Sequence, residues 1–96
     1  MRDYIEIDGD KIYYYKRDID RYNKIYINRL TDKQRKILKR MVKKPISYKD
    51  TLDITNKDGF RSIREALNLK LSQPFDKDVI VGKNGIYKIK LDVVFK

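Results

Sequence analysis

Hydrophobic and polar residues alternate along the front of the chain. Residues 4–8 and 11–15 follow a period close to two, and Gly9-Asp10 between them has the composition of a turn. Residues 24–27 form a third short alternating segment, whereas the polar stretch 16–23 is typical of a loop. This pattern predicts a three-stranded antiparallel meander within residues 1–30. We expect its buried face to carry four isoleucines, Ile5, Ile7, Ile25 and Ile27.

A helical period replaces the alternation at residue 31. Thr31-Asp32-Lys33-Gln34 matches a capping box, with Leu30 placed as a hydrophobic staple. Apolar residues then recur at helical spacing until Pro45, which cannot continue a helix. Ser47 precedes a second, shorter helix that we predict over residues 48–54, with Leu52 as its anchor.

A third helix is predicted over residues 60–71, followed by a hairpin. Its apolar stripe, which we assign to the core, consists of Phe60, Ile63, Leu67 and Leu71. Residues 79–81 and 86–91 pair around Gly82-Lys83-Asn84-Gly85, whose glycines and asparagine permit the positive φ values of a tight turn. The two isoleucines Ile86 and Ile89 differ in parity, which suggests a bulge near residue 86.

These elements predict one α+β domain over residues 1–96. An N-terminal sheet occupies residues 1–30, a three-helix core residues 31–72 and a hairpin residues 78–92. This order of elements predicts a winged helix-turn-helix with an N-terminal antiparallel β-meander, three helices and a C-terminal hairpin as its wing.

The charge of the chain indicates what kind of partner it binds. The formal net charge is +10, and residues 31–45 hold seven basic side chains against Asp32 alone. A charge asymmetry of this kind favours a polyanionic partner through counterion release. The alternative is a lysine-rich helix face that is simply solvated.

The residue inventory excludes several chemistries. Cysteine and histidine are both absent, which removes disulfides, thiolate nucleophiles and the usual transition-metal ligands. Four acidic residues near a turn, Asp8, Asp10, Asp18 and Asp20, lack the spacing of a calcium loop. No apolar run approaches the length of a membrane span, and no apolar segment follows Met1. We expect a cytoplasmic, non-catalytic protein without cofactor, metal, small-molecule ligand or membrane contact.

Two sets of residues have the chemistry to contact DNA. Arginine reads guanine, asparagine reads adenine and glutamate accepts from cytosine, so the polar face of the third helix supplies candidate base contacts. These are Arg61, Ser62, Glu65 and Asn68. Cations elsewhere supply candidate contacts to the DNA backbone, namely Lys33, Lys36, Arg40, Lys57, Arg64, Lys83 and Lys88.

The order of elements resembles the OmpR/PhoB-type winged-helix domains, the DNA-binding output domains of many response regulators. The likeness extends over nearly the whole chain and rests on Leu30-Thr31-x-x-Gln34, Pro45, the long third helix and Asn84-Gly85-Ile86-Tyr87. Gln34 stands where the family usually has glutamate, and one extra residue precedes Tyr87 compared with the family's wing ending. The resemblance implies a sequence-specific transcriptional regulator whose third helix enters the major groove of double-stranded DNA, while its wing, residues 79–91, contacts the backbone or minor groove.

Two other functions remain open at this stage. Six of the eight tyrosines lie in the first thirty residues, and Tyr13 and Tyr15 point opposite to Tyr14 on a strand, as in a stacking platform for single-stranded nucleic acid. The same tyrosines are also typical of strands that cover a small core. The basic surfaces could alternatively bind an acidic protein. For the duplex-DNA hypothesis we expect a homodimer or tandem binding.

Overall fold

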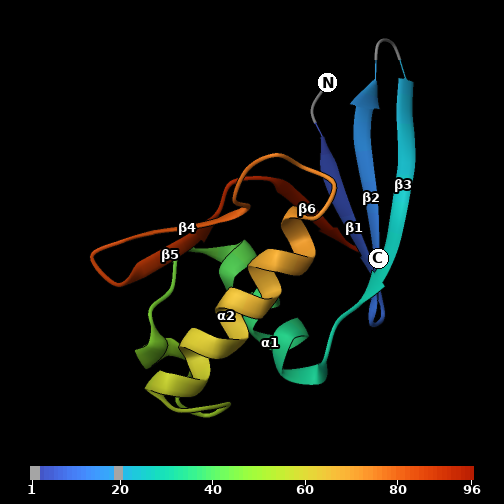
Figure 1. Cartoon of the computed structure of the whole chain (residues 1–96). Coiled ribbons are helices and arrows are strands. Elements are labelled where there is room, and N and C mark those ends of the chain that lie inside the picture. The colour runs from blue at the N-terminus through green and yellow to red at the C-terminus, as the bar shows by residue number, and fades with distance from the viewer. Residues whose placement is uncertain (1–2, 19–20) are drawn as a thin grey trace.

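A four-stranded sheet forms one half of the molecule (Figure 1). The computed structural model describes residues 3–18 and 21–96, and for residues 18 and 21–27 the backbone alone. The sheet consists of β1 (Tyr4–Asp8), β2 (Lys11–Asp18), β3 (Arg21–Arg29) and β6 (Asp92–Phe95), in the order β3-β2-β1-β6. β1, β2 and β3 form an antiparallel meander, whereas β6 runs parallel to β1.

The sheet differs from the predicted meander in two respects. β2 and β3 continue through most of residues 16–23, which the sequence predicts as a loop. β3 is an edge strand, where polar and charged side chains are common because they deter pairing with another chain. The second difference is β6, since no strand is predicted for residues 92–95.

The core lies between the sheet and the helices. Ile5 pairs with Tyr14 and Ile7 with Ile12, so these four side chains share one face, and all are fully buried. The Tyr14 hydroxyl donates a hydrogen bond to the main-chain oxygen of Lys70 and thereby ties the sheet to the helix of residues 57–72. Burial of Ile5 and Ile7 agrees with the prediction, whereas the side chains of Ile25 and Ile27 lie outside the described residues.

The first helix, α1 (Asp32–Lys43), begins with the predicted capping box. The Thr31 hydroxyl accepts the Gln34 amide at 3.2 Å, and Gln34 Oε1 accepts the Thr31 amide at 3.0 Å. Ile37, Leu38 and Met41 are buried in the hydrophobic core. The local pattern therefore suffices to specify this element.

The predicted three-helix core is wrong, because the described residues form two α-helices and a single 3-10 turn, η1 (Tyr48–Thr51). In an α-helix the carbonyls of Tyr48 and Asp50 would accept amides four residues later. Instead the Thr51 hydroxyl bonds to the Tyr48 carbonyl at 2.9 Å, and Arg40 Nη1 bonds to the Asp50 carbonyl at 2.8 Å. The Ile54 amide turns back to Thr51, so the turn does not become a helix. Leu52, the predicted anchor, is exposed.

The second helix, α2 (Lys57–Ser72), begins three residues before its predicted start. Asn56 caps it by accepting the Gly59 amide at 2.7 Å, so residues 57–59, which precede the predicted helix, form its first turn. Phe60, Leu67 and Leu71 are buried, and Ile63 packs against the same core.

The hairpin of β4 (Ile80–Lys83) and β5 (Ile86–Ile89) extends beside α2 (Figure 1). Asn84 and Gly85 alone form its tip, with φ of 57° and 77°, which fits a two-residue type I′ turn. The register is regular, so the predicted bulge is absent from this hairpin and Ile86 is simply exposed. Two backbone bonds between Ile46 and Tyr87 anchor β5 to the segment before η1.

Candidate nucleic-acid interface

The exposed face of α2 carries three of the four predicted base contacts. Arg61, Ser62 and Glu65 are all exposed, opposite the buried stripe of the helix. Arg61 Nε lies 3.2 Å from Glu65 Oε1, and the Arg61 side chain is 74% exposed. An exposed pair four residues apart on a helix is worth only about 0.2–0.5 kcal/mol. Both groups are therefore available to a ligand at little cost.

Leu69 lies on this same face and is absent from the predicted contacts. It follows Ser62 by seven residues, which is close to two helical turns, and it is 73% exposed. The sequence signal was its position outside the apolar stripe of the helix. An exposed leucine beside polar groups offers apolar contact to a thymine methyl group.

Asn68, the fourth predicted base contact, uses its side-chain amide within the fold. Its Oδ1 accepts the amides of Val79 at 3.1 Å and Ile80 at 2.9 Å, and the Ser72 hydroxyl at 3.0 Å. Its Nδ2 donates to Asp78 at 3.0 Å. Asn68 thus joins α2 to the start of β4, and its amide is not available to read a base without breaking that junction.

Arg64 joins α2 to the other strand of the hairpin. Its guanidinium lies 3.9 Å from the centroid of the Tyr87 ring and 5.6 Å from that of Phe60. Only 16% of the Arg64 side chain is exposed. Gly82 faces Tyr87 across the hairpin, and a Cβ at Gly82 would overlap the Tyr87 ring. The glycine therefore allows the ring to lie over β4 and present a face to Arg64.

A groove separates η1, the first half of α2 and the hairpin tip. Lys49 and Lys57 lie on its rim, and the Lys57 ammonium sits 5.3 Å from the Tyr48 ring centroid. Four basic side chains line the groove, Lys49, Lys57, Arg61 and Arg64. Only Asp58 and Glu65 oppose them among its lining residues, so the groove is positively charged.

The two predicted hairpin cations lie on the outer face of the hairpin. Lys83 pairs with Ile86 and Lys88 with Val81, so both lysines share the face opposite to Tyr87 and Ile89. Both are exposed. Lys88 borders a separate groove beside β6 and is not brought together with the α2 face.

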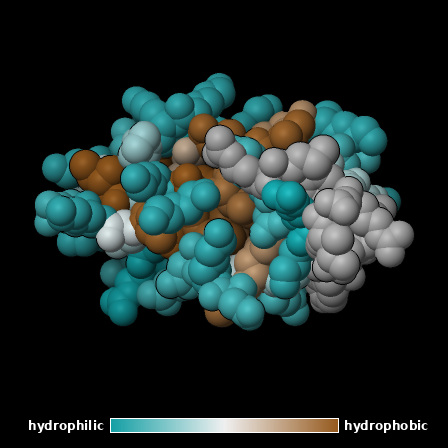
Figure 2. Space-filling view, turned by 90° about the horizontal axis from the view of Figure 1, so that it is seen from above, coloured by the Kyte–Doolittle hydropathy of each residue, from teal (hydrophilic) through white to brown (hydrophobic). Residues whose placement is uncertain are grey.

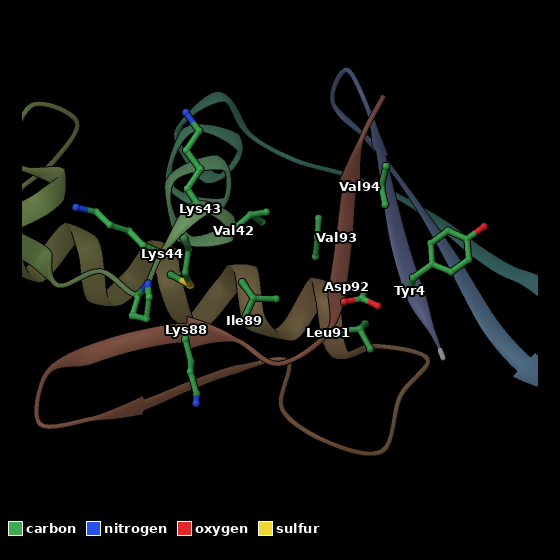
Figure 3. A pocket seen from close by; sticks show the side chains of 12 residues that line it. Tyr4, Val42, Lys43, Lys44, Lys88, Ile89, Leu91, Asp92, Val93 and Val94 are labelled. Carbon is green, nitrogen blue, oxygen red and sulfur yellow. The ribbon is translucent and has the colours of Figure 1, made fainter. Parts of the chain in front are cut away.

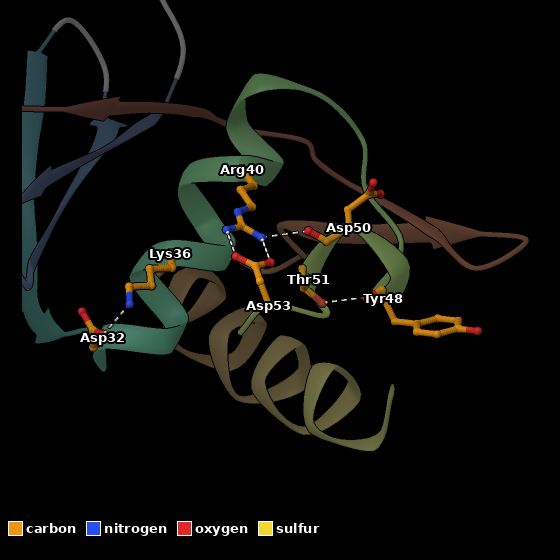
Figure 4. Close-up of polar contacts among 7 residues, drawn as sticks. All are labelled: Asp32, Lys36, Arg40, Tyr48, Asp50, Thr51 and Asp53. Carbon is orange, nitrogen blue, oxygen red and sulfur yellow. Dashed lines mark hydrogen bonds and ion pairs between the residues drawn. The ribbon is translucent and has the colours of Figure 1, made fainter. Parts of the chain in front are cut away.

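The predicted cations of α1 line a third surface, distinct from the groove along α2. Lys33 and Lys36 are exposed there, and Lys36 pairs with Asp32 at 3.2 Å. Arg40 instead forms a bidentate ion pair with Asp53, in which Nη1 and Nη2 each lie 2.6 Å from a carboxylate oxygen (Figure 4). Hydrogen bonding from Arg40 lowers the pKa of Asp53 to about 2, and the same bond raises the pKa of Arg40. Arg40 therefore fixes η1 to α1.

The described residues contain no cluster of three or more acidic side chains placed to hold a metal ion. Of the helices in that part of the chain, none has the length and apolar character needed to cross a bilayer.

Comparison with known proteins adds no assignment. No family model, no curated protein and no solved structure matches this chain, and nothing in these comparisons identifies an OmpR/PhoB-type domain. The geometry of the three basic surfaces is accordingly the basis on which a function can be argued.

Proposed function

We propose that this protein binds double-stranded DNA sequence-specifically and regulates transcription. The exposed face of α2 would enter the major groove, with the tip of the β4–β5 hairpin against the adjacent backbone or minor groove. The observation that carries the proposal is a helix buried on one face, open on the other and bordered by a positively charged groove.

The dimensions of α2 support this mode of binding. Its 16 residues give a length of about 24 Å at 1.5 Å per residue, and a helix fits the major groove, which is about 12 Å wide. On its exposed face Arg61 would read guanine, Glu65 would accept from cytosine, and Leu69 would contact a thymine methyl group. Leu69 thus replaces Asn68 among the proposed base contacts.

Phosphate contacts come from cations around this helix. Lys49 and Lys57 lie on the groove rim, and Lys83 lies at the end of β4, next to the turn. Phosphate contacts orient a protein on the duplex, whereas base contacts select the sequence. Lys33 and Lys36 on α1 add to the long-range attraction. One module of this size buries about 600–1,000 Å² on DNA, which favours a homodimer or tandem copies for tight binding. The cytoplasmic location remains a prediction.

The first test is fluorescence anisotropy with random duplex and single-stranded oligonucleotides over a salt titration. We expect duplex preference and a steep decrease of affinity with salt. Lys57→Ala should weaken binding to every sequence alike and reduce the salt slope by about one unit. Lys77→Ala, an exposed lysine away from the groove, is the matched control.

Base reading is tested on an operator selected from a random duplex pool. Arg61→Ala should relax the choice at one base pair by about 1–3 kcal/mol, and Leu69→Ala should relax the preference for thymine at a neighbouring A·T pair. Equal losses on all sequences would contradict base reading by α2. Absence of salt-dependent duplex binding would refute the proposal as a whole.

Single-stranded binding by the tyrosines is less well supported. Tyr4 and Tyr15 stack on each other, with ring centroids 4.6 Å apart and planes 6° apart. The Tyr15 hydroxyl donates to Glu6 at 3.3 Å, and burial together with this carboxylate raises the pKa of Tyr15. The Glu6 carboxylate, bonded to the Tyr15 hydroxyl, would repel the phosphates of a bound strand. Single-strand preference in the anisotropy experiment would favour this surface instead.

A further inference from the structure

The outer edge of β6 is an open strand edge. Among the described strands β6 pairs only with β1, and the Lys96 amide bonds to the Ile7 carbonyl at 2.8 Å. Backbone groups of successive strand residues point to alternate sides. The groups of Val93 and Phe95 therefore face away from β1, and they form no backbone hydrogen bond with another residue of the described ranges.

A groove runs along this edge, between β6, the end of α1 and β5 (Figure 3). Val42 and Val93 project into the space between α1 and β6, and Ile89 lies below them in that view. Figure 2 shows one face of the molecule, on which apolar side chains gather in the middle with hydrophilic ones around them. The apolar lining and the unpaired edge thus occur together.

Three exposed lysines border the groove, Lys43 and Lys44 at the end of α1 and Lys88 on β5. Asp92 is the only acidic residue among its described lining. An occupant that carries carboxylates would therefore be attracted, whereas a basic one would be repelled.

We propose that the edge of β6 binds an extended acidic segment of a partner protein, in which carboxylate and apolar side chains alternate, as a fifth strand of the sheet. Its main chain would pair with Val93 and Phe95, its apolar side chains would contact Val42 and Ile89, and its carboxylates would meet the three lysines.

The positive charge of the groove and the unpaired edge of β6 together favour an acidic peptide over a second copy of the chain or a nucleic acid. A second copy pairing edge to edge would bring its own Lys43, Lys44 and Lys88 against the same positive rim, which is repulsive. Nucleic acid would satisfy the lysines but would leave the strand edge unpaired and the apolar lining uncovered. Only an acidic peptide in extended conformation uses all three features.

The test uses a labelled eight-residue peptide in which glutamate alternates with valine, added to the full chain. Two matched peptides carry lysine in place of glutamate, or N-methyl groups that remove the amide donors. We expect binding of the first peptide alone. Reversal of two rim charges, Lys43→Glu with Lys88→Glu, should weaken it about tenfold, whereas Lys77→Glu should leave it unchanged.

Hydrogen exchange locates the contact directly. Bound peptide should slow exchange of the Val93 and Phe95 amides, while Val94, whose amide faces β1, should change little. Binding that survives N-methylation and is competed by random duplex DNA would overturn the proposal in favour of nucleic acid. A dimer of the free protein in sedimentation, with no peptide binding, would overturn it in favour of self-association. Failure of the double reversal to weaken binding would also refute it.

Discussion

Replacing Asn68 with alanine removes the side chain that connects α2 to the start of β4. Two main-chain amides depend on its Oδ1, those of Val79 and Ile80, and both residues are almost fully buried. The Val79 amide keeps a second acceptor, the Ser72 hydroxyl at 3.0 Å. The Ile80 amide faces away from β5 and has no other acceptor among the described residues, so it loses its hydrogen bond.

The loss of stability follows from the Ile80 amide, which is left without an acceptor. A buried amide without a partner costs about 1–3 kcal/mol, and the higher helix propensity of alanine returns at most about 0.7 kcal/mol. We therefore expect Asn68→Ala to destabilise the fold by about 1–2 kcal/mol. For a domain of this size such a loss lowers the melting temperature by roughly 4–16 °C.

Thermal unfolding followed by circular dichroism measures the effect, with Ser62→Ala as control. Ser62 is exposed on the same helix, and its substitution should change stability by no more than about 0.5 kcal/mol. In DNA-binding assays Asn68→Ala should weaken all sequences alike, because it loosens the hairpin. Unchanged stability, combined with relaxed choice at a single base pair, would refute this reasoning and restore Asn68 as a base reader.

Two further substitutions test other parts of the site. Gly82→Ala should destabilise the protein by about 1–3 kcal/mol in urea denaturation, because the new Cβ displaces the Tyr87 ring on which Arg64 stacks; a neutral effect would contradict that packing. Asp53→Asn tests how much the ion pair between Asp53 and Arg40 contributes to stability at different pH values. The lowered pKa of Asp53, about 2 against an ordinary 3.8, stabilises the fold above pH 3.8, and this contribution is lost as the pH falls through about 2. The difference in melting temperature between wild type and Asp53→Asn should therefore shrink between pH 4 and pH 2, and a constant difference would count against the ion pair.

Local signals in the sequence were sufficient for α1, the hairpin and the core of α2. The capping box at Thr31 involves residues three apart, and the type I′ turn needs only Asn84 and Gly85. Gly59 illustrates the limit of such signals, because it has the composition of a turn residue but sits in a helix. A Cβ there would overlap the Thr55 hydroxyl, so the glycine serves packing rather than a turn.

Tertiary contacts account for what the sequence did not reveal. The helix predicted over residues 48–54 is instead a 3-10 turn, in which Arg40 bonds to the Asp50 carbonyl and the Ile54 amide bonds to Thr51. β6 escaped prediction because its partner β1 lies at the opposite end of the chain, and Asp92-Val93-Val94-Phe95 places an apolar residue on both faces. Non-local parallel pairing leaves little trace in a local pattern.

The sequence predicted which residue types the candidate site contains, but not which of these side chains are exposed to a ligand. Arginine and asparagine on a polar helix face are the types that read bases, yet Asn68 and Arg64 are used to hold the hairpin against α2. Their sequence neighbours Glu65 and Leu69 remain exposed. Which of two adjacent residues faces inward depends on where the hairpin packs, and that position also depends on contacts outside the helix, such as the backbone bonds between Ile46 and Tyr87.

Asn68 and Arg64, which hold the hairpin instead of contacting DNA, also affect the affinity for DNA. Asn68 fixes one end of the hairpin, Arg64 stacks on its middle at Tyr87, and Ile46 bonds to the same residue from the opposite side. Three attachments, two from α2 and one from the segment before η1, hold the hairpin in one orientation relative to α2 before any ligand is present. A ligand that meets a preformed surface does not spend binding free energy on ordering it. Loss of any one attachment should therefore reduce affinity for every duplex sequence, whereas loss of Arg61 should change which sequence is preferred.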